Sequence, residues 1–143
     1  MDDTVILDSL YYMALNSAKK MALELGENKD IFWHDEWVDT LKKEFNRKCW
    51  KGKYYSSNAK KFQDDRANAL ASLSGLAGAE KQPSIVGNVL IPNQYCSPHF
   101  EWMVEEAMCY ARYYEAALKC IKERYQLHCG CLVIFLKDFQ RSS

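Results

Sequence analysis

The sequence predicts an all-α protein built from three antiparallel helical hairpins. Three observations favour this fold class over a mixed or all-β one. Apolar residues recur three and four positions apart in five of six segments, which is the spacing of one helix face. Capping residues, glycines and prolines separate these segments, as helix boundaries require. No alternation of apolar and polar residues typical of a strand occurs before residue 126.

The first two segments form the first predicted hairpin. We expect one apolar stripe of the first helix to face the core, and its members are Leu7, Leu10, Tyr11, Ala14, Ala18, Met21 and Leu25. Gly26 is placed to end this helix, and Asp30 can cap the next. The second helix carries a stripe at strict i+4 spacing, which predicts core positions for Trp33, Trp37, Leu41 and Phe45. Lys51-Gly52 ends it.

The middle of the chain predicts a loop and then a second hairpin. Residues 53–63 are polar, with two tyrosines, and have room for a short strand pair. Asp64 or Asp65 caps a third helix, whose many small residues allow a neighbouring helix to approach closely. Gly75 lies inside this predicted helix, where a glycine costs up to about 1 kcal/mol of helix propensity. Pro83 opens a short fourth helix with the apolar residues Ile85, Val86, Val89 and Leu90.

The last predicted hairpin starts after a loop over residues 91–96. Ser97-Pro98 is an N-cap followed by a proline at the first helical position, so it starts a fifth helix. That helix is expected to bury Met103, Val104, Ala107 and Met108. Near Tyr113 the chain turns into a sixth helix, whose inner face carries Ala117, Cys120, Ile121 and Arg124. Residues 126–143 are apolar and β-prone without helical periodicity, and predict either a single buried strand or a disordered apolar end.

Composition and charge exclude several classes of function. The 143 residues are 48% hydrophobic with a net charge of zero, which fits one globular domain. This balance gives no support for a nucleic-acid partner or a membrane surface. A basic stretch over residues 41–61, interleaved with Trp50, Tyr54 and Tyr55, could contact a phosphate backbone, but a solvated helix face is the simpler interpretation. We expect no signal peptide and no membrane span, and therefore a cytoplasmic location by default.

The cysteines predict neither disulfides nor a metal site. The chain is large enough to build a core without disulfides, and it has no secretory signal. Cys109 and Cys120 lie on predicted apolar helix faces and are interpreted as small core residues. His128, Cys129 and Cys131 crowd together, but a zinc site needs a second, separated ligand pair that the sequence lacks.

Three stretches of this sequence together resemble a known family. They are LYYMALNSAKKMA at residues 10–22, DDRANALA followed by LSGLA within residues 64–77, and CSPHFEW at residues 96–102 with EAM, AAL and KERY behind it. In this order and spacing they resemble the bacterial α-L-rhamnosidase family of the six-hairpin glycosidases. The resemblance covers about residues 3–125. None of these stretches is a catalytic signature.

The resemblance implies a fold, a reaction and a substrate class. The fold is an (α/α)6 toroid, of which residues 1–125 would form about half as a partial catalytic domain, followed by a non-family apolar tail at 126–143. The reaction is the inverting hydrolysis of a terminal α-linked rhamnose on a glycan or glycoside, with one carboxylic acid and one carboxylate base. The family's acid lies upstream of the matched region and its base follows Arg124-Tyr125. The resemblance therefore implies no catalytic residue in this chain, and neither metal nor organic cofactor.

Four residues are the candidates for substrate binding: Asp65, Arg66, His99 and Glu101. A carboxylate and a guanidinium can hold sugar hydroxyls, although an N-cap with a structural ion pair explains Asp65 and Arg66 more simply. Glu101 suits the dipole at a helix start, and His99 could line the mouth of a cleft. Asp65 and Glu101 open two helices whose starts could share one rim, so they are the carboxylate pair of interest.

Other residues are weaker candidates, and two other functions stay open. Tyr54, Tyr55 and Tyr95 are predicted loop aromatics that could stack on a sugar. His34-Asp35-Glu36 is interpreted as the acidic first turn of a helix and not as an acid–base centre.

The alternatives to a hydrolase fragment are a helical interaction module and a small carbohydrate-binding protein. Half a toroid would also expose apolar faces, which predicts self-association. The loss of both pattern and resemblance after Tyr125 predicts a shifted reading frame or a truncated gene.

Overall fold

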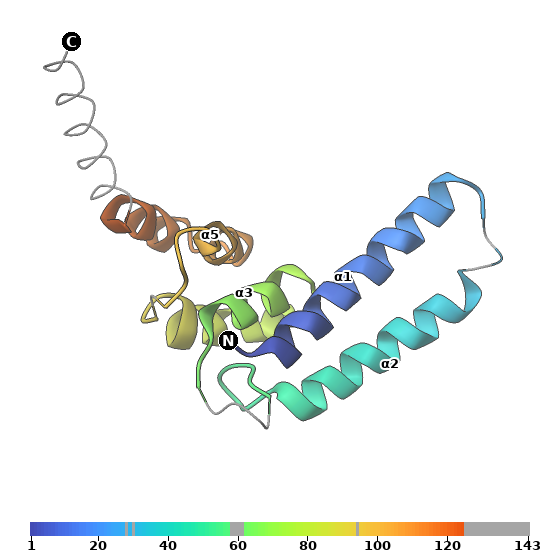
Figure 1. Cartoon of the computed structure of the whole chain (residues 1–143), viewed down its shortest axis with the longest axis horizontal. Helices are drawn as coiled ribbons and strands as arrows, with labels where there is room; N and C mark the ends of the chain where they lie inside the picture. Colours follow the sequence, from blue (N-terminus) through green and yellow to red (C-terminus); the bar gives the residue numbers. More distant parts are fainter. Residues whose placement is uncertain (28, 30, 58–61, 94, 125–143) are drawn as a thin grey trace, which may run out of the picture.

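The computed structural model describes residues 1–124 apart from 28, 30, 58–61 and 94 (Figure 1). The predicted all-α class is confirmed, since the described residues form helices and no strand beyond one isolated bridge between Trp50 and Tyr55. The elements are α1 (Asp3–Glu24), α2 (Phe32–Cys49), α3 (Asp65–Leu73), the 3-10 turn η2 (Ala79–Lys81), α4 (Gln82–Ile85), the π-helical turn η3 (Val86–Leu90), α5 (Glu101–Tyr110) and a last helix at residues 114–124. Asp30 and the tail at 126–143, with His128, Cys129 and Cys131, lie outside the described residues.

The helices are arranged around α3. The two long helices α1 and α2 lie side by side and are joined at the end far from α3 (Figure 1). α3 packs against both α1 and α5, and η3 packs beneath α3 and α5. Asp2, just before α1, is hydrogen-bonded to Asp64, just before α3. Asp65 at the start of α3 is in turn bonded to Cys96, shortly before α5. The helices α1, α3 and α5 therefore begin at the same end of the molecule.

Several helix ends follow the sequence signals, and two do not. Gly26 has a φ of +75° just after α1, as predicted, and of the two predicted cap candidates Asp64 is the N-cap of α3. Gly75 has a φ of +84° and lies beyond the end of α3, so its predicted place inside the helix is wrong. α5 begins at Glu101 rather than after Ser97, whose carbonyl instead closes a turn with the Phe100 N–H at 2.9 Å. The N–H of Cys96 is bonded to Asp65 and its carbonyl to Arg124, so the chain is fixed here before the helix starts.

The buried face of α1 is not the predicted one. α1 buries Val5, Ser9 and Tyr12, whereas Leu7 and Met21 of the predicted stripe are 64% and 61% exposed. Apolar residues occur on every side of α1, so periodicity does not single out one face. Ser9 can be buried in this contact because its hydroxyl donates to the Val5 carbonyl at 2.7 Å, which leaves no unpaired polar group.

The buried face of α2 also differs from the prediction. Its buried side chains include His34, Val38 and Phe45, while Trp33 and Trp37 are 56% and 53% exposed. The predicted core positions of both tryptophans are therefore wrong. His34 lies inside because its Nε2 is 2.8 Å from the Leu15 carbonyl oxygen of α1, which satisfies a buried ring nitrogen.

The remaining core agrees with the sequence in most places. The four apolar residues of α4 and η3 are buried as predicted, and they are Ile85, Val86, Val89 and Leu90. In the last two helices Val104, Ala107, Met108 and Ala117 are buried, but Cys109 and Ile121, which were predicted to face inward, are exposed. The four cysteines of the described region are free thiols. None of the described helices combines the length and the apolarity that a membrane crossing needs.

Candidate functional site

Four buried carboxylates mark the starts of α1, α3 and α5. Each is 1% exposed, and together we name them the carboxylate row: Asp2, Asp64, Asp65 and Glu101. Charged groups this deeply buried are rare unless they are paired or hydrogen-bonded. The hydrogen-bond partners of each carboxylate oxygen therefore determine whether these side chains are free to bind a ligand or take part in a reaction.

Asp2 and Asp64 connect the start of α1 to the start of α3. The Asp2 backbone N–H donates to Asp64 Oδ2 at 2.8 Å, and Asp2 Oδ2 accepts from the Ser57 N–H at 2.7 Å. Asp64 Oδ1 caps α3 by accepting from the N–H groups of Arg66 and Ala67 at 3.1 and 3.3 Å. Each carboxylate thus satisfies donors of a helix start and holds a neighbouring segment in place.

Asp65 and Glu101 are linked through the backbone of Cys96 and the side chain of Arg124. Asp65 Oδ2 accepts from the Cys96 N–H at 2.8 Å, while the Arg124 guanidinium donates to the Cys96 carbonyl at 3.2 Å. Arg124 also forms a close ion pair with Glu101. The predicted pair Asp65 and Glu101 is thereby linked through Cys96: Asp65 bonds its N–H directly, and Glu101 is connected to its carbonyl through Arg124.

The burial of Cys96 makes it an inert thiol. Desolvation raises its pKa to about 11, and the Asp65 carboxylate adds to this rise. Because the thiolate is the nucleophilic form, this cysteine has no role as a nucleophile near neutral pH.

The other two predicted site residues lie differently. The half-buried Arg66 pairs with Asp64, its Nε being 3.3 Å from Oδ1, so it belongs to the row. His99 is exposed in the turn before α5, and its ring packs edge-on against Phe100 at 4.9 Å. The structure therefore gathers Asp65, Arg66 and Glu101 and leaves His99 outside this group.

A second carboxyl group lies next to Glu101. Glu105 follows one turn later on α5, and its buried Oε1 has no hydrogen-bond partner among the described residues. Desolvation raises the pKa of Glu105, and the negative charge of Glu101 raises it further, against a smaller opposing effect of Arg124. Glu101 and Glu105 are thus two carboxyl groups whose surroundings differ: one is held in an ion pair, and the pKa of the other is raised by burial.

Ligand atoms of Glu101, Glu105 and Cys120 all lie within 4.8 Å of one another. Two carboxylate oxygens and a sulfur could hold a divalent cation such as zinc. However, Arg124 already supplies a positive charge to Glu101, and burial raises the pKa of the Cys120 thiol, so the thiolate ligand is disfavoured. The donor set therefore does not fit a metal well.

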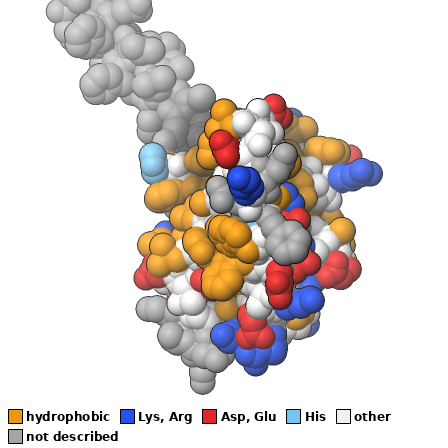
Figure 2. Space-filling view, turned by 90° about the vertical axis from the view of Figure 1, so that its right-hand side faces the viewer, with side chains coloured by type: hydrophobic (Ala, Val, Ile, Leu, Met, Phe, Trp, Pro, Cys, Tyr) orange, Lys and Arg blue, Asp and Glu red, His pale blue; other side chains and the backbone are white. Residues whose placement is uncertain are grey.

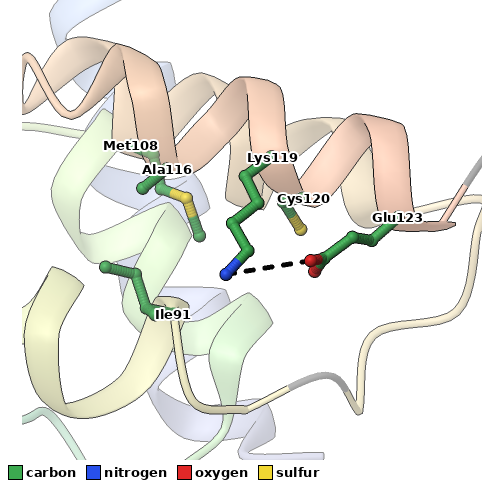
Figure 3. Close-up of a pocket in the computed structure, with 6 residues that line it drawn as sticks. All are labelled: Ile91, Met108, Ala116, Lys119, Cys120 and Glu123. Carbon is green, nitrogen blue, oxygen red and sulfur yellow. Dashed lines mark ion pairs between the residues drawn. The ribbon is translucent and has the colours of Figure 1, made fainter.

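A small pocket of about 190 Å³ opens beside Cys120. Figure 3 shows Lys119 and Glu123 of the last helix reaching toward each other across it, and their ion pair measures 3.8 Å. Met108 and Ile91 form its apolar wall. The pocket carries charge only at this exposed ion pair, and the carboxylate row does not line it.

The spacing of the carboxyl groups limits the chemistry of the site. An inverting glycosidase needs carboxyl groups about 6.5–9.5 Å apart so that water fits between them and the sugar. Glu101 and Glu105 approach within 4.8 Å, which is too close for that arrangement. Both carboxylate oxygens of Asp65 already accept hydrogen bonds from backbone N–H groups, those of Arg66 and Cys96. The row as it stands holds helix starts together, which is the simpler of the two interpretations of Asp65 and Arg66.

The aromatic and basic candidates from the sequence, among the residues that the structure describes, do not join the carboxylate row. Tyr55 lies in the predicted loop but is fully buried against Phe45 and Trp50, with ring centroids 5.0 and 4.9 Å away, so its predicted role in stacking on a sugar is wrong. Tyr95 is 73% exposed. In the basic stretch, the exposed Arg47 pairs with Glu44 at 2.6 Å, as on an ordinary solvated helix face.

Sequence reasoning missed Asp2, Arg124 and Glu105 as members of this region. Asp2 had a readable signal, since an aspartate directly before a helical apolar pattern is a typical N-cap. Arg124 was predicted on the inner face of the last helix, but the neighbours of Arg124 and Glu105 had no sequence signal, because they are set by how the last helix packs on α5.

No protein-family model matches this chain, and searches among curated proteins and solved structures gave no significant match.

Proposed function

We propose that this chain is part of the catalytic domain of an α-L-rhamnosidase-like glycoside hydrolase, which removes terminal α-linked rhamnose with inversion. The observation that carries the proposal is the coincidence of motif and geometry. The stretch DDRANALA begins with Asp64 and Asp65, and CSPHFEW contains Cys96 and Glu101. These residues from separate stretches meet in one hydrogen-bonded region.

The arrangement of the helices supports a toroidal fold as part of the proposal. In an (α/α)6 toroid the inner helices run parallel, and each outer helix returns the chain to the next start. Here α1, α3 and α5 begin at one end and pack in series, and α1 and α2 form a contacting pair. In this reading α2, the α4–η3 segment and residues 114–124 are the returning helices, which makes three hairpins of six.

The carboxylate row has a structural role in the proposed enzyme. An inner rim must hold its helix starts rigidly, because catalytic groups fail when they are misplaced by as little as about 1 Å. Asp2, Asp64 and Asp65 do this by accepting backbone N–H bonds from neighbouring segments. By the resemblance, the acid and the base come from residues beyond those matched here, and the row would position the rim that carries them.

The test is to read the gene on both sides of this coding sequence, in all frames. We expect codons for further six-hairpin helices on both sides, with the acid upstream of this coding sequence and the base in another frame after the Tyr125 codon. The joined polypeptide should hydrolyse an aryl α-L-rhamnoside and release β-rhamnose first, as proton NMR of the fresh product can show. The 143-residue chain alone should give no hydrolysis above the buffer blank.

Two outcomes would overturn the proposal. One is flanking DNA without any rhamnosidase-like continuation. The other is turnover by the 143-residue chain that disappears in Asp65→Asn or Glu101→Gln, since this would make the row itself catalytic.

A further inference from the structure

A hollow of about 470 Å³ lies at the far end of α3 and α5 from the carboxylate row. Its lining includes Ala77, just beyond α3, Gln82 of α4, and Tyr110 and Arg112 at the end of α5. α3 has nine residues and α5 has ten, and a helix rises about 1.5 Å per residue, so roughly 13–15 Å separate the hollow from the row. The hollow is therefore a separate place, within the size range of about 300–1,000 Å³ that small-ligand pockets occupy.

Gln82 is the unusual residue of this hollow. Its side chain is 6% exposed, yet neither its amide nitrogen nor its amide oxygen has a hydrogen-bond partner among the described residues. A buried amide without hydrogen-bond partners destabilises the folded state, so a role for it has to be considered. The terminal torsion of glutamine is soft, so the amide can turn toward the hollow that it lines. It would then offer two donors and one acceptor side by side.

Arg112 and Tyr110 add two further binding groups. Arg112 is exposed with a φ of 67°, a left-handed conformation that costs free energy for a residue other than glycine. The structure gives its guanidinium no ion pair with any described residue, and no carboxylate lines the hollow. Tyr110 is 61% exposed and offers an aromatic face with a hydroxyl at its edge.

The combination selects the chemistry of the ligand. An anion would satisfy the guanidinium of Arg112 and the amide donors of Gln82, but it would leave the Gln82 oxygen without a donor. Neighbouring hydroxyl groups both donate and accept, so they satisfy all of these atoms. A ring with apolar C–H edges can in addition cover the face of Tyr110.

We propose that this hollow is a non-catalytic sugar-binding site, in which Gln82 and Arg112 bind adjacent hydroxyls of a pyranose and Tyr110 covers its C–H face. The choice of rhamnose as the first sugar to test rests on the proposed function. The site itself follows from the three side chains.

The experiment is a ligand-observed NMR titration of the 143-residue chain with L-rhamnose, D-glucose and glycerol. We expect L-rhamnose to bind, and Gln82→Leu and Arg112→Gly each to weaken its binding at least tenfold. Arg112→Gly should at the same time raise the thermal midpoint, because glycine adopts the left-handed conformation without strain. If this variant binds more weakly although it is more stable, the loss of binding cannot be due to unfolding. Arg47→Ala, at another exposed arginine, serves as the control and should bind as the wild type does.

The arms of this titration separate the two proposals. Gln82-dependent binding of D-glucose without L-rhamnose would support the site and show that its sugar is not the one the proposed function suggests. Absence of binding by either sugar, binding that both variants leave unchanged, or glycerol binding as tight as sugar binding would overturn the site. The rhamnosidase proposal would still be decided by the gene sequence alone.

Discussion

At the scale of single residues, Asp64 satisfies more partners than a helix cap needs. Its Oδ1 accepts from two N–H groups of α3 and from Arg66 Nε, and its Oδ2 accepts from the Asp2 N–H. One side chain therefore caps α3 and fixes the start of α1, which are 62 residues apart.

Replacing Asp64 by alanine should destabilise the protein by roughly 2–4 kcal/mol. Loss of an N-cap costs about 1 kcal/mol, and the buried Asp2 N–H left without a partner adds about 1–3 kcal/mol. Urea unfolding followed by circular dichroism measures this difference. Asp3→Ala is the matched control, because Asp3 is exposed in the first turn of α1 and should cost less than about 1 kcal/mol. Equal costs for the two variants would refute the linking role of Asp64.

Glu105 predicts a pH dependence of stability. Burial and the charge of Glu101 raise its pKa above the ordinary value of 4.5, so the folded state binds this proton more tightly than the unfolded chain does. The contribution of Glu105 to stability is therefore unfavourable above the folded pKa. It becomes less unfavourable as the pH falls through that pKa toward 4.5.

The variant Glu105→Gln should isolate this contribution. At pH 7 it should be as stable as the wild type or more so, and the difference should shrink as the pH falls toward 4.5. Carboxyl groups with lowered pKa values, such as Asp35 and Glu44, titrate in the opposite sense in both proteins and cancel in the comparison. Glu106→Gln, which removes the same charge at an exposed neighbouring position, is the matched control. A stability difference that does not change with pH would count against the raised pKa.

At the scale of the elements, replacing a glycine by alanine should have opposite effects on stability at a helix end and inside a helical turn. Gly75 ends α3 with a φ of +84°, and the Ala77 N–H beyond it donates back to Ala71 at 2.9 Å. Gly87 lies within η3, is exposed, and a Cβ added to it would meet no atom within 4 Å. The first glycine is required by its backbone conformation, and the second is not.

We expect Gly75→Ala to destabilise the protein by about 1–2 kcal/mol, because the left-handed conformation is unfavourable for alanine. Gly87→Ala should instead stabilise it by about 0.4–1 kcal/mol, because alanine loses less backbone entropy on folding. Chemical unfolding of both variants in one buffer provides the comparison. Two changes of the same sign would show that the end of α3 or the shape of η3 is not as described.

At the scale of the whole molecule, much apolar surface is exposed. Figure 2 looks onto the end where α1 joins α2 and shows apolar side chains gathered among charged ones. Large apolar residues at least half exposed include Leu7, Met21, Leu23, Leu25, Trp33, Trp37 and Trp102. Contiguous apolar patches beyond a few hundred Å² promote association, and a net charge of zero offers little repulsion to oppose it.

We therefore predict that the protein self-associates at micromolar concentration. Sedimentation velocity over a range of concentrations should show species larger than the 16.6 kDa monomer. The double variant Leu7→Lys with Leu10→Lys should reduce association, since it charges the exposed side of α1. The control Ser17→Lys with Thr40→Lys adds the same charge at exposed polar positions and should associate more than the leucine variant. A strictly monomeric, sharply melting wild type would contradict the prediction.

The sequence by itself determined the features that depend on neighbours along the chain. The all-α class, the end of α1 at Gly26, the cap at Asp64 and the buried residues of α4 and η3 all follow from local signals. These signals work because a cap, a left-handed glycine and a run of closely spaced apolar residues act within one or two helical turns. The resemblance to rhamnosidases added the proposed function, which helix periodicity alone does not contain.

Only the tertiary structure decided which helix faces are buried and which carboxylates meet. On α1 and α2 apolar residues occur on several sides, so the buried face depends on the neighbouring helix, and Ser9 and His34 lie inside because partners satisfy them. Asp65 meets Cys96 across 31 positions, and Arg124 pairs with Glu101 from the last helix. Such contacts join residues far apart in sequence, and the energy of a buried charge depends on the partner that packing brings to it.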